Sequence, residues 1–289
     1  MKIAVSSDWH VDTVTAGVER EPELRDHIDA LALFGRRHRS EGTGLIVLGD
    51  YFDPGTRRDC ERASFLIDAW RLLRPEFDWT VWLAGNHDVV ERCTFSPGSQ
   101  SLDFSTVLTP LRACVDGDTA WHEPTVVAEL AWAIRHVSAS MLDEQGKGGV
   151  CVLALPFVAA CVRKEMAKVP LDTDGNAVAL ARDWLVENET GILVIAGHRT
   201  IAGIHPGSET TDMPRGGDYP IPPAALELAR QNPKRVVVVN GHYHEPQTFM
   251  HEGVPISIPG CPFRATFGEV DGPDRGFIVI DTDVIRAGW

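Results

Sequence analysis

One pattern recurs along the chain and constrains its fold more than any other feature: a short apolar, β-branched segment ends abruptly in small and polar residues. It occurs in KIAVSSDWH (2–10), GLIVLGDYFD (44–53), TVWLAGNHD (80–88), GILVIAGH (191–198) and RVVVVNGHYH (235–244). A sixth segment, GVCVLALPF (149–157), has the apolar run without ionisable residues at its end. Near-continuous apolar runs of this length are typical of strands that are buried on both faces.

Stretches with a helical spacing of apolar residues separate these segments. They lie at 21–40, 60–75, 177–189 and 222–233, and prolines end two of them. Strands that alternate with helices predict a layered α/β fold. No linker-like or low-complexity stretch divides the chain, so we expect a single domain over residues 1–289. The long loop 203–220, rich in Gly, Pro and Thr, is more typical of a lid or binding loop than of a domain boundary.

The ends of these apolar segments carry side chains that commonly bind metals. Each residue alone has a plain explanation as a polar turn. However, ligands bind beyond the carboxyl ends of the strands in open α/β sheets, where residues far apart in sequence converge. Because such residues follow an apolar strand five times, the sequence favours a metal site over a series of turns. The candidates are Asp8, His10, Asp50, Asn86, His87, His198, His242 and His244.

Five motifs resemble those of the calcineurin-like metallophosphoesterases: Asp8-x-His10, Gly49-Asp50-x-x-Asp53, Gly85-Asn86-His87-Asp88, Gly197-His198 and Gly241-His242-x-His244. The resemblance implies a four-layer α/β/β/α sandwich with two metal ions between the sheets. It further implies that Asp50 bridges the two metals and that Asp53 supports the ligands without binding a metal itself. The remaining ligands would divide into two sets, one of Asp8, His10 and His244 and one of Asn86, His198 and His242.

The same resemblance implies phosphoester hydrolysis. A hydroxide that bridges the metals would attack phosphorus in line, His87 would protonate the leaving oxygen, and Asp88 would orient His87. The mixed oxygen and nitrogen ligand set suits manganese, iron or zinc rather than calcium. Trp9 and Tyr243 alternate with ligands, so we expect both rings to point away from the site into packing.

A narrower resemblance is to the SbcD-type DNA repair nucleases. SSDWH, GDYFDPG, AGNHD and GHYHEPQ carry it, together with the segment ISIPGCPFRATFGEVDGPDRGFIVID. It implies a manganese-dependent exonuclease and endonuclease with DNA as the substrate. Arg58 and Arg199 are candidate contacts to the DNA backbone, although a solvated surface position is an equal alternative for each. Only seven residues follow Thr282. The DNA-capping and ATPase-docking regions of that family are therefore expected to be absent, which leaves an SbcC-like ATPase partner and a homodimer as open expectations.

Composition narrows the alternatives. A formal charge of −14 argues against a protein that coats nucleic acid with a basic surface, but a site that holds divalent cations is locally positive. The alternatives are a small-molecule phosphodiesterase or phosphomonoesterase (cyclic nucleotide, nucleotide or phosphoprotein) and, more remotely, a non-catalytic scaffold. The six cysteines form no CxxC pair, and no apolar run approaches the roughly 18 residues of a membrane span. We therefore expect reduced thiols, a cytoplasmic location and no membrane partner.

Overall fold

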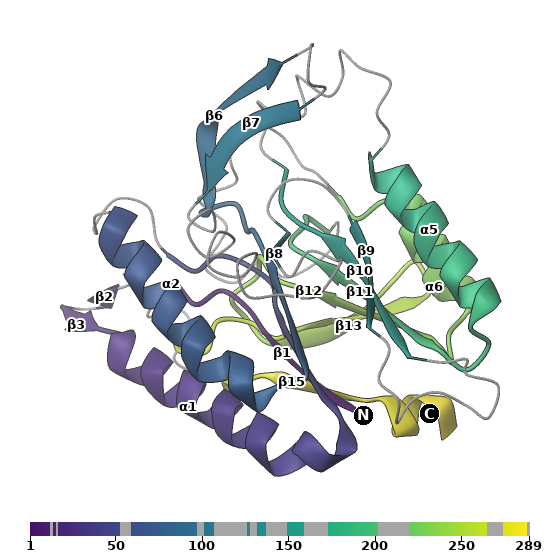
Figure 1. Ribbon diagram of the computed structural model, residues 1–289, viewed down its shortest axis with the longest axis horizontal. Coiled ribbons are helices and arrows are strands. Elements are labelled where there is room, and N and C mark those ends of the chain that lie inside the picture. Colours follow the sequence, from purple (N-terminus) through teal and green to yellow (C-terminus); the bar gives the residue numbers. More distant parts are fainter. Residues whose placement is uncertain are drawn as a thin grey trace.

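The computed structural model describes a mixed α/β protein (Figure 1). The described residues are 1–11, 14–15, 17–52, 59–96, 101–106, 126–127, 132–136, 149–158, 173–201, 220–264 and 274–287.

Two sheets form the centre of the molecule. The first has the order β15-β1-β4-β5-β8 and consists of β1 (Lys2–Ser6), β4 (Thr43–Val47), β5 (Trp79–Leu83), β8 (Val126–Val127) and β15 (Ile278–Asp281). The second has the order β13-β14-β12-β11-β10-β9 and consists of β9 (Trp132–His136), β10 (Val150–Leu155), β11 (Ile192–Gly197), β12 (Val236–Asn240), β13 (Gln247–His251) and β14 (Val254–Ile258). The central strands of both sheets are parallel, whereas β15, β9 and β13 each run antiparallel to a neighbour.

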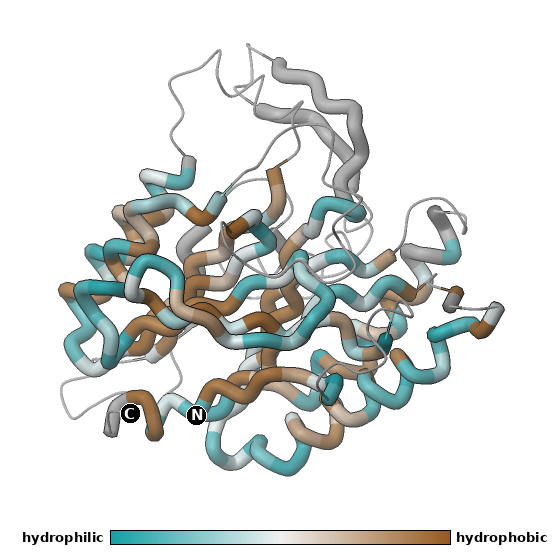
Figure 2. Tube along the Cα trace, turned by 180° about the vertical axis from the view of Figure 1, so that it is seen from behind, coloured by the Kyte–Doolittle hydropathy of each residue, from teal (hydrophilic) through white to brown (hydrophobic). Residues whose placement is uncertain are grey.

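The sheets pack face to face over a shared apolar core. This core combines residues of β1, β4 and β5 with residues of β10, β11 and β12, among them Val5, Ile46, Val81, Val152 and Val194. Figure 2 shows the apolar chain concentrated in these inner strands and the hydrophilic chain on the outer helices. Burial of both faces explains why the strand sequences are continuous apolar runs rather than alternating ones.

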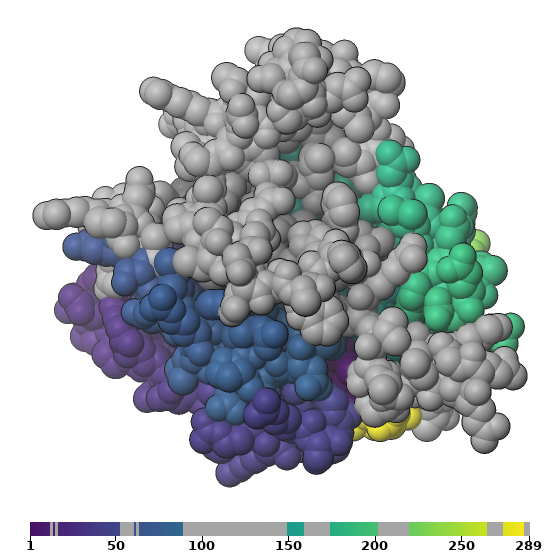
Figure 3. Space-filling view, in the orientation of Figure 1, coloured from purple at the N-terminus to yellow at the C-terminus, as the bar shows by residue number. Residues whose placement is uncertain are grey.

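Helices cover the outer face of each sheet. Helix α1 (Glu21–His38) and helix α2 (Asp59–Leu73) share an apolar cluster with the outer face of the first sheet, and α5 (Thr173–Glu187) and α6 (Pro223–Gln231) do the same for the second. In Figure 3, α1 and α2 lie on one flank and α5 on the other. The predicted four-layer α/β/β/α sandwich is confirmed.

Some short elements were not predicted from the sequence. They are the hairpins β2–β3 (Val14–Thr15, Val18–Glu19) and β6–β7 (Val89–Ser96, Ser101–Thr106), strands β8, β9 and β13, the short helical turns η1 (Arg39–Glu41) and η2 (Arg74–Glu76), and helix α7 (Thr282–Ala287). The loop 203–220 lies almost wholly outside the described residues, so its predicted role stays a prediction.

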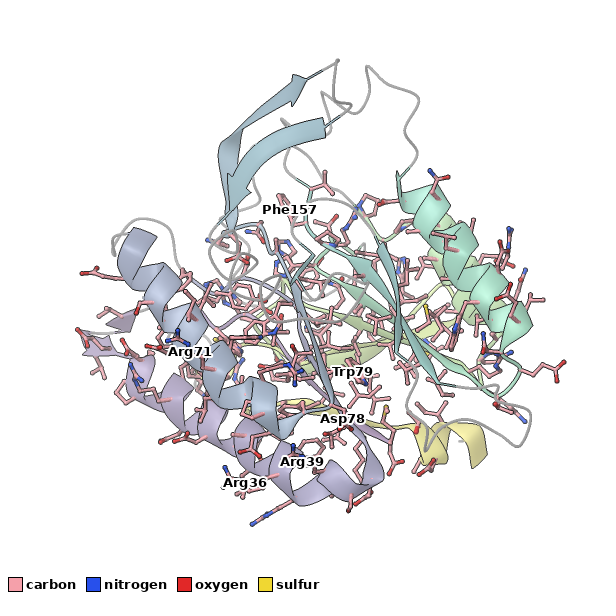
Figure 4. The ribbon with its side chains drawn as sticks, viewed as in Figure 1. Arg36, Arg39, Arg71, Asp78, Trp79 and Phe157 are labelled. Atoms are coloured by element: carbon pink, nitrogen blue, oxygen red, sulfur yellow. The ribbon has the colours of Figure 1, made fainter. Side chains whose placement is uncertain are left out.

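The carboxyl ends of the parallel strands meet at one edge of the sandwich. The loop after β10 reaches the loop after β5 through a hydrogen bond of 2.9 Å from the Phe157 amide to the Ala84 carbonyl oxygen. Figure 4 shows Phe157 at this end of the strands, and Asp78 and Trp79, where β5 begins, at the opposite end. The strand-end residues of both sheets are therefore brought to the same side.

The amino end and helix α7 lie together on the other side (Figure 1). The Thr282 backbone amide and hydroxyl both donate to the Met1 carbonyl oxygen, each at 3.0 Å. Within the described part of the chain, no helix has the length and apolar character needed to span a membrane.

Candidate metal centre

The candidate ligands follow β1, β4, β5, β11 and β12 directly, and all except the half-buried Asn86 are almost completely enclosed. Their backbone is unusual, because four of the five described non-glycine residues with positive φ lie among them. These four are Asp8 (φ 54°), His10 (φ 40°), Asp50 (φ 53°) and His242 (φ 78°). A left-handed conformation costs free energy in an L-residue, and such residues cluster at sites where the fold must aim a side chain. Here the turn that ends each strand directs the side chains inward.

A first cluster joins the end of β1 to the end of β12. It consists of Asp8, His10 and His244, whose potential ligand atoms lie within 4.8 Å of one another. The two imidazoles face each other, with 2.9 Å between His10 Nε2 and His244 Nε2. Asp8 Oδ1 accepts the His242 backbone amide at 3.2 Å, while the buried Asp8 Oδ2 finds no hydrogen-bond partner in the part of the chain that the structure describes.

A second cluster joins the ends of β4 and β5 to those of β11 and β12. It contains Asp50, His198 and His242, again with ligand atoms within 4.8 Å. Asn86 completes it, because its Oδ1 lies 2.9 Å from His198 Nε2 and 2.8 Å from His242 Nδ1. Asp50 Oδ2 lies 3.2 Å from His198 Nε2.

The atoms of the second cluster indicate whether a divalent cation would fit between them. His198 Nδ1 lies 2.6 Å from the Leu48 carbonyl oxygen, which can only accept, so Nδ1 carries a proton and it is Nε2 that can offer a lone pair to a cation. Nε2 faces the Asn86 and Asp50 oxygens, and Asp50 Oδ2 is buried 3.2 Å from it. Buried acceptors that point at one another need a proton or a metal ion between them. The residues therefore fit a divalent cation.

The charge states agree with this fit. Burial lowers the pKa of His198, but the Asp50 carboxylate outweighs it and raises this pKa to about 9, so at neutral pH Nε2 holds a proton toward Asp50 that a cation would displace. Burial acts in the opposite sense on Asp50, yet the neighbouring His198 and His87 together hold the pKa of Asp50 well below its usual value. Burial raises the pKa of Asp8. The site thus gathers groups whose charges need a partner in a region closed to water.

His87 lies beside both clusters. Its ring is 5.2 Å from the His10 ring, and its Nε2 is 3.9 Å from Asp50 Oδ2. Its backbone amide donates to Asp50 Oδ1 at 2.9 Å, which fixes the loop, and its buried Nε2 has no hydrogen-bond partner among the described residues. The side chain keeps 12% of its surface exposed, so part of the ring has access from outside.

Asp88 has a different role from the one predicted. Its carboxylate accepts three backbone amides, from Gly85 and Asp50 at 2.8 Å each and from Tyr51 at 3.1 Å. Among the described residues no hydrogen bond joins it to His87, so the prediction that Asp88 orients the His87 ring is wrong. It ties the turn after β4 to the turn after β5, and burial raises its pKa to about 6.

Two glycines show how closely these turns pack. A Cβ on Gly85 would lie 2.0 Å from Asp50 Oδ1, and one on Gly241 would lie 2.2 Å from Ser7 Oγ. The glycine that precedes four of the five polar motifs in the sequence was the available signal for this close approach.

The prediction that Arg199 contacts the DNA backbone is also wrong. It is fully buried, its Nε donates to the Leu155 carbonyl oxygen at 3.2 Å, and its guanidinium forms two hydrogen bonds to Asp174 at 3.2 and 3.3 Å. A guanidinium held in this way joins the turn after β11 to the start of α5 and is not available to DNA. Asp53 and Arg58 lie outside the described residues, so their predicted roles stay predictions.

The two aromatic residues between the ligands behave as predicted. Trp9 is fully buried against Tyr51 and Trp82, with ring centroids 5.6 Å from each. Tyr243 is buried in the core under α5 and α6, and its hydroxyl oxygen accepts the Ile201 amide at 2.7 Å. Both rings point away from the site, as the alternation with the ligands required.

Comparison with known proteins agrees with this geometry. The family model described as calcineurin-like phosphoesterase matches residues 1–246, and the chain therefore belongs to the calcineurin-like phosphoesterase family. No curated protein sequence matches significantly.

Solved structures with similar folds share little sequence with this chain. A dimetal phosphatase from Danio rerio is 14% identical, covers 96% of this chain and 91% of its own, and has a TM-score of 0.48. GAP50, the anchor in the inner membrane complex of Plasmodium, is 11% identical over 96% of this chain and 80% of its own, with a TM-score of 0.47. Phosphopantetheinyl hydrolase from Mycobacterium tuberculosis is 19% identical over 90% of both chains, with a TM-score of 0.37. Relatives this distant do not bear on the substrate.

Proposed function

We propose that this chain hydrolyses phosphoesters with two divalent metal ions. Asp8, His10 and His244 would hold one ion, and Asn86, His198 and His242 the other, with Asp50 between them. The convergence of possible ligand atoms in the second cluster carries the proposal, because a divalent cation there would meet His198 Nε2, Asn86 Oδ1 and Asp50 Oδ2 together in place of the proton on His198. A ligand set of carboxylate, amide and imidazole suits manganese, with iron or zinc as alternatives.

Two bound cations would supply an acidified water and a clamp on the phosphoryl oxygens. The residues of the protein fix the geometry of the site. His198 is held by the Leu48 carbonyl, so its Nε2 faces the cluster in a fixed orientation. The glycines before Asn86 and His242 let the turns pack against Asp50 and Ser7.

His87 is the proton donor in this proposal. Its Nε2 has no hydrogen-bond partner among the described residues, its ring lies 5.2 Å from the His10 ring, and its Nε2 lies 3.9 Å from Asp50 Oδ2. A positioned imidazole can transfer a proton to a leaving oxygen at neutral pH. The side chain keeps 12% of its surface exposed, so part of the ring is open to a substrate.

We propose DNA as the substrate, on the SbcD-like motifs at the strand ends and in the segment after His244. Manganese-dependent exonuclease and endonuclease activity belongs to this proposal, as do a homodimer and an SbcC-like ATPase partner. A small phosphoester is the second candidate. The burial of Arg199 favours it, because one of the two arginines proposed to contact the DNA backbone is held by Asp174.

One substrate panel separates the candidates. The purified protein with Mn²⁺ is given linear duplex DNA, single-stranded DNA, a bis-aryl phosphodiester and an aryl phosphomonoester, each in parallel with the Asp50→Ala variant. DNA cleavage that the variant lacks supports the nuclease. Monoester turnover without DNA cleavage supports the small-molecule enzyme. If no substrate is cleaved faster by the wild-type protein than by the variant, the phosphoesterase proposal fails.

A further inference from the structure

His27 is a buried histidine outside the two metal clusters. It lies on α1, on the side that faces the first sheet, and only 8% of the residue is exposed. Burial lowers its pKa to about 4, so the ring is neutral at physiological pH. Its ring packs edge-on against Phe277, with 5.9 Å between centroids.

One hydroxyl connects His27 to the turn that carries two proposed ligands. Ser6, the last residue of β1, has its Oγ 2.8 Å from His27 Nε2, and Trp9 Nε1 donates to the same oxygen at 2.8 Å. An indole N–H can only donate, so Ser6 accepts from Trp9. A hydroxyl oxygen accepts two hydrogen bonds and donates one, so the same Ser6 group can bond to His27 Nε2 in either tautomer of the neutral ring.

Trp9 is the residue between Asp8 and His10. Both neighbours hold left-handed backbone conformations, with φ of 54° and 40°, which are unfavourable for residues with side chains. Two such residues around one tryptophan need support from outside the turn. The fully buried Trp9 ring supplies it through edge contacts with Tyr51 and Trp82, and the hydrogen bond to Ser6 fixes the direction of the indole.

We infer that His27 is a positioning residue for the metal site: through Ser6 it fixes Trp9, and so it holds the Asp8-Trp9-His10 turn in the conformation that presents both ligands. This inference rests on the proposed function. It assigns to α1, a helix that contributes no ligand, a role in metal affinity. We expect loss of His27 to lower metal affinity more at the cluster of Asp8, His10 and His244 than at the second cluster.

The variants for the test are chosen to separate positioning from packing. His27→Ala removes the hydrogen bond and the ring, whereas His27→Gln keeps an amide that can reach Ser6. Trp9→Phe removes the indole N–H and retains an aromatic ring. Leu31→Ala is the matched control, because Leu31 is fully buried on the same helix and packs in the same apolar cluster but is not part of the hydrogen-bonded chain.

Mn²⁺ affinity is measured by titration calorimetry and by the EPR signal of free Mn²⁺, and folding by thermal unfolding in chelator. We expect His27→Ala and Trp9→Phe each to weaken the binding of one Mn²⁺ about 10-fold or more, within the range seen for residues behind metal ligands. His27→Gln should stay within about 3-fold of the wild-type protein, on the same scale. Leu31→Ala should lower the unfolding temperature and leave Mn²⁺ affinity unchanged.

The double variant His27→Ala, Trp9→Phe gives a second criterion. If both residues act through Ser6, the second substitution adds little to the first, so the losses in Mn²⁺ affinity are not additive. Losses that add fully, or a His27→Ala protein that binds Mn²⁺ as Leu31→Ala does, overturn the inference while the proposed function stands. Should His27→Ala not fold, Trp9→Phe and Ser6→Ala decide the question by the same affinity criterion. Failure of the wild-type protein to bind Mn²⁺ overturns the proposed function, and this inference with it.

Discussion

At the scale of single residues, the site depends on backbone conformations that few residue types accept. Asp8, His10, Asp50 and His242 all have positive φ. Asp, Asn and His enter the left-handed region more readily than most residues, since their short polar side chains form local hydrogen bonds. The residue types that bind metals are thus also the types that tolerate these turns. Asp and His can therefore occupy the turn directly after a buried strand and still bind a metal.

His87→Ala tests the division of labour between ligands and proton donor. Because His87 is outside both clusters, the variant should retain the wild-type Mn²⁺ affinity, and kcat should fall about 10²- to 10⁴-fold, the range for loss of general acid catalysis. Calorimetry and steady-state kinetics with the best substrate of the panel measure the two quantities. His38→Ala, which changes a partly exposed histidine paired with Glu41, is the control. Parallel loss of metal and activity would show that His87 is a ligand instead.

His27 predicts how acid affects stability. Burial lowers its folded-state pKa from the ordinary 6.5 to about 4, so the unfolded chain binds the proton first as pH falls. The stability from this residue is complete above pH 6.5 and is lost as pH falls toward 4, by roughly 3 kcal/mol in all. His27→Gln cannot titrate, so its free energy of unfolding, measured in urea in the presence of chelator, should decline less over this interval. Parallel curves for the two proteins would contradict the prediction.

At the scale of elements, long apolar strands and amphipathic helices were predictable, and short half-buried strands were not. Strand β11 is a continuous apolar run because both of its faces are covered. Strand β13 has an alternating, partly exposed pattern and forms because it pairs with β14. The local sequence of β13 does not reveal this pairing. The ligand positions were predictable for the same reason as β11: each follows a strong strand signal.

The role of Arg199 was not predictable, because its partner is distant in sequence. An arginine directly after His198 resembles a substrate contact as long as the chain is read locally. Asp174 stands 25 positions earlier, at the start of α5, and only the fold brings the two together. The same holds for Asp88, whose carboxylate binds amides of the preceding motif across 37 and 38 positions.

The Arg199–Asp174 pair should therefore contribute to stability. Arg199→Met removes the guanidinium that neutralises the Asp174 carboxylate, so we expect a loss of about 3 kcal/mol in the free energy of unfolding. Arg71→Met is the control: its ion pair with Asp68 is exposed on both sides, and its loss should cost under about 1 kcal/mol. Urea unfolding in chelator measures both.

The double variant Arg199→Met, Asp174→Leu distinguishes a buried pair from a general packing effect. Removal of both charges leaves no uncompensated group, so part of the lost stability should return. If Asp174→Leu instead lowers the free energy of unfolding of Arg199→Met further, by as much as an independent substitution in the core would, the ion pair is not the source of the lost stability.

At the scale of the whole molecule, each proposed metal draws ligands from both sheets. Asp8 and His10 follow β1 of the first sheet, and His244 follows β12 of the second. The other cluster likewise combines the ends of β4 and β5 with those of β11 and β12. The strands of the two sheets pack on each other through an apolar core, which is not directional. Metals at this edge would fix the alignment of one sheet on the other.

Metal binding should consequently stabilise the entire fold against heat. A ligand that binds only the native state adds RT ln(1 + [L]/Kd), which is about 2.7 kcal/mol when Mn²⁺ is present at 100 times its Kd. We expect calorimetry to show a single cooperative transition that moves to higher temperature with Mn²⁺ and returns when a chelator is added. Because His242 follows a strand of the second sheet and its Nδ1 lies 2.8 Å from Asn86 Oδ1 at the end of β5, His242→Ala should abolish most of the shift. Asp68→Ala, a change to an exposed carboxylate on α2, should keep it. A shift of the same size in His242→Ala would mean that Mn²⁺ stabilises the protein from somewhere other than the edge where the sheets meet.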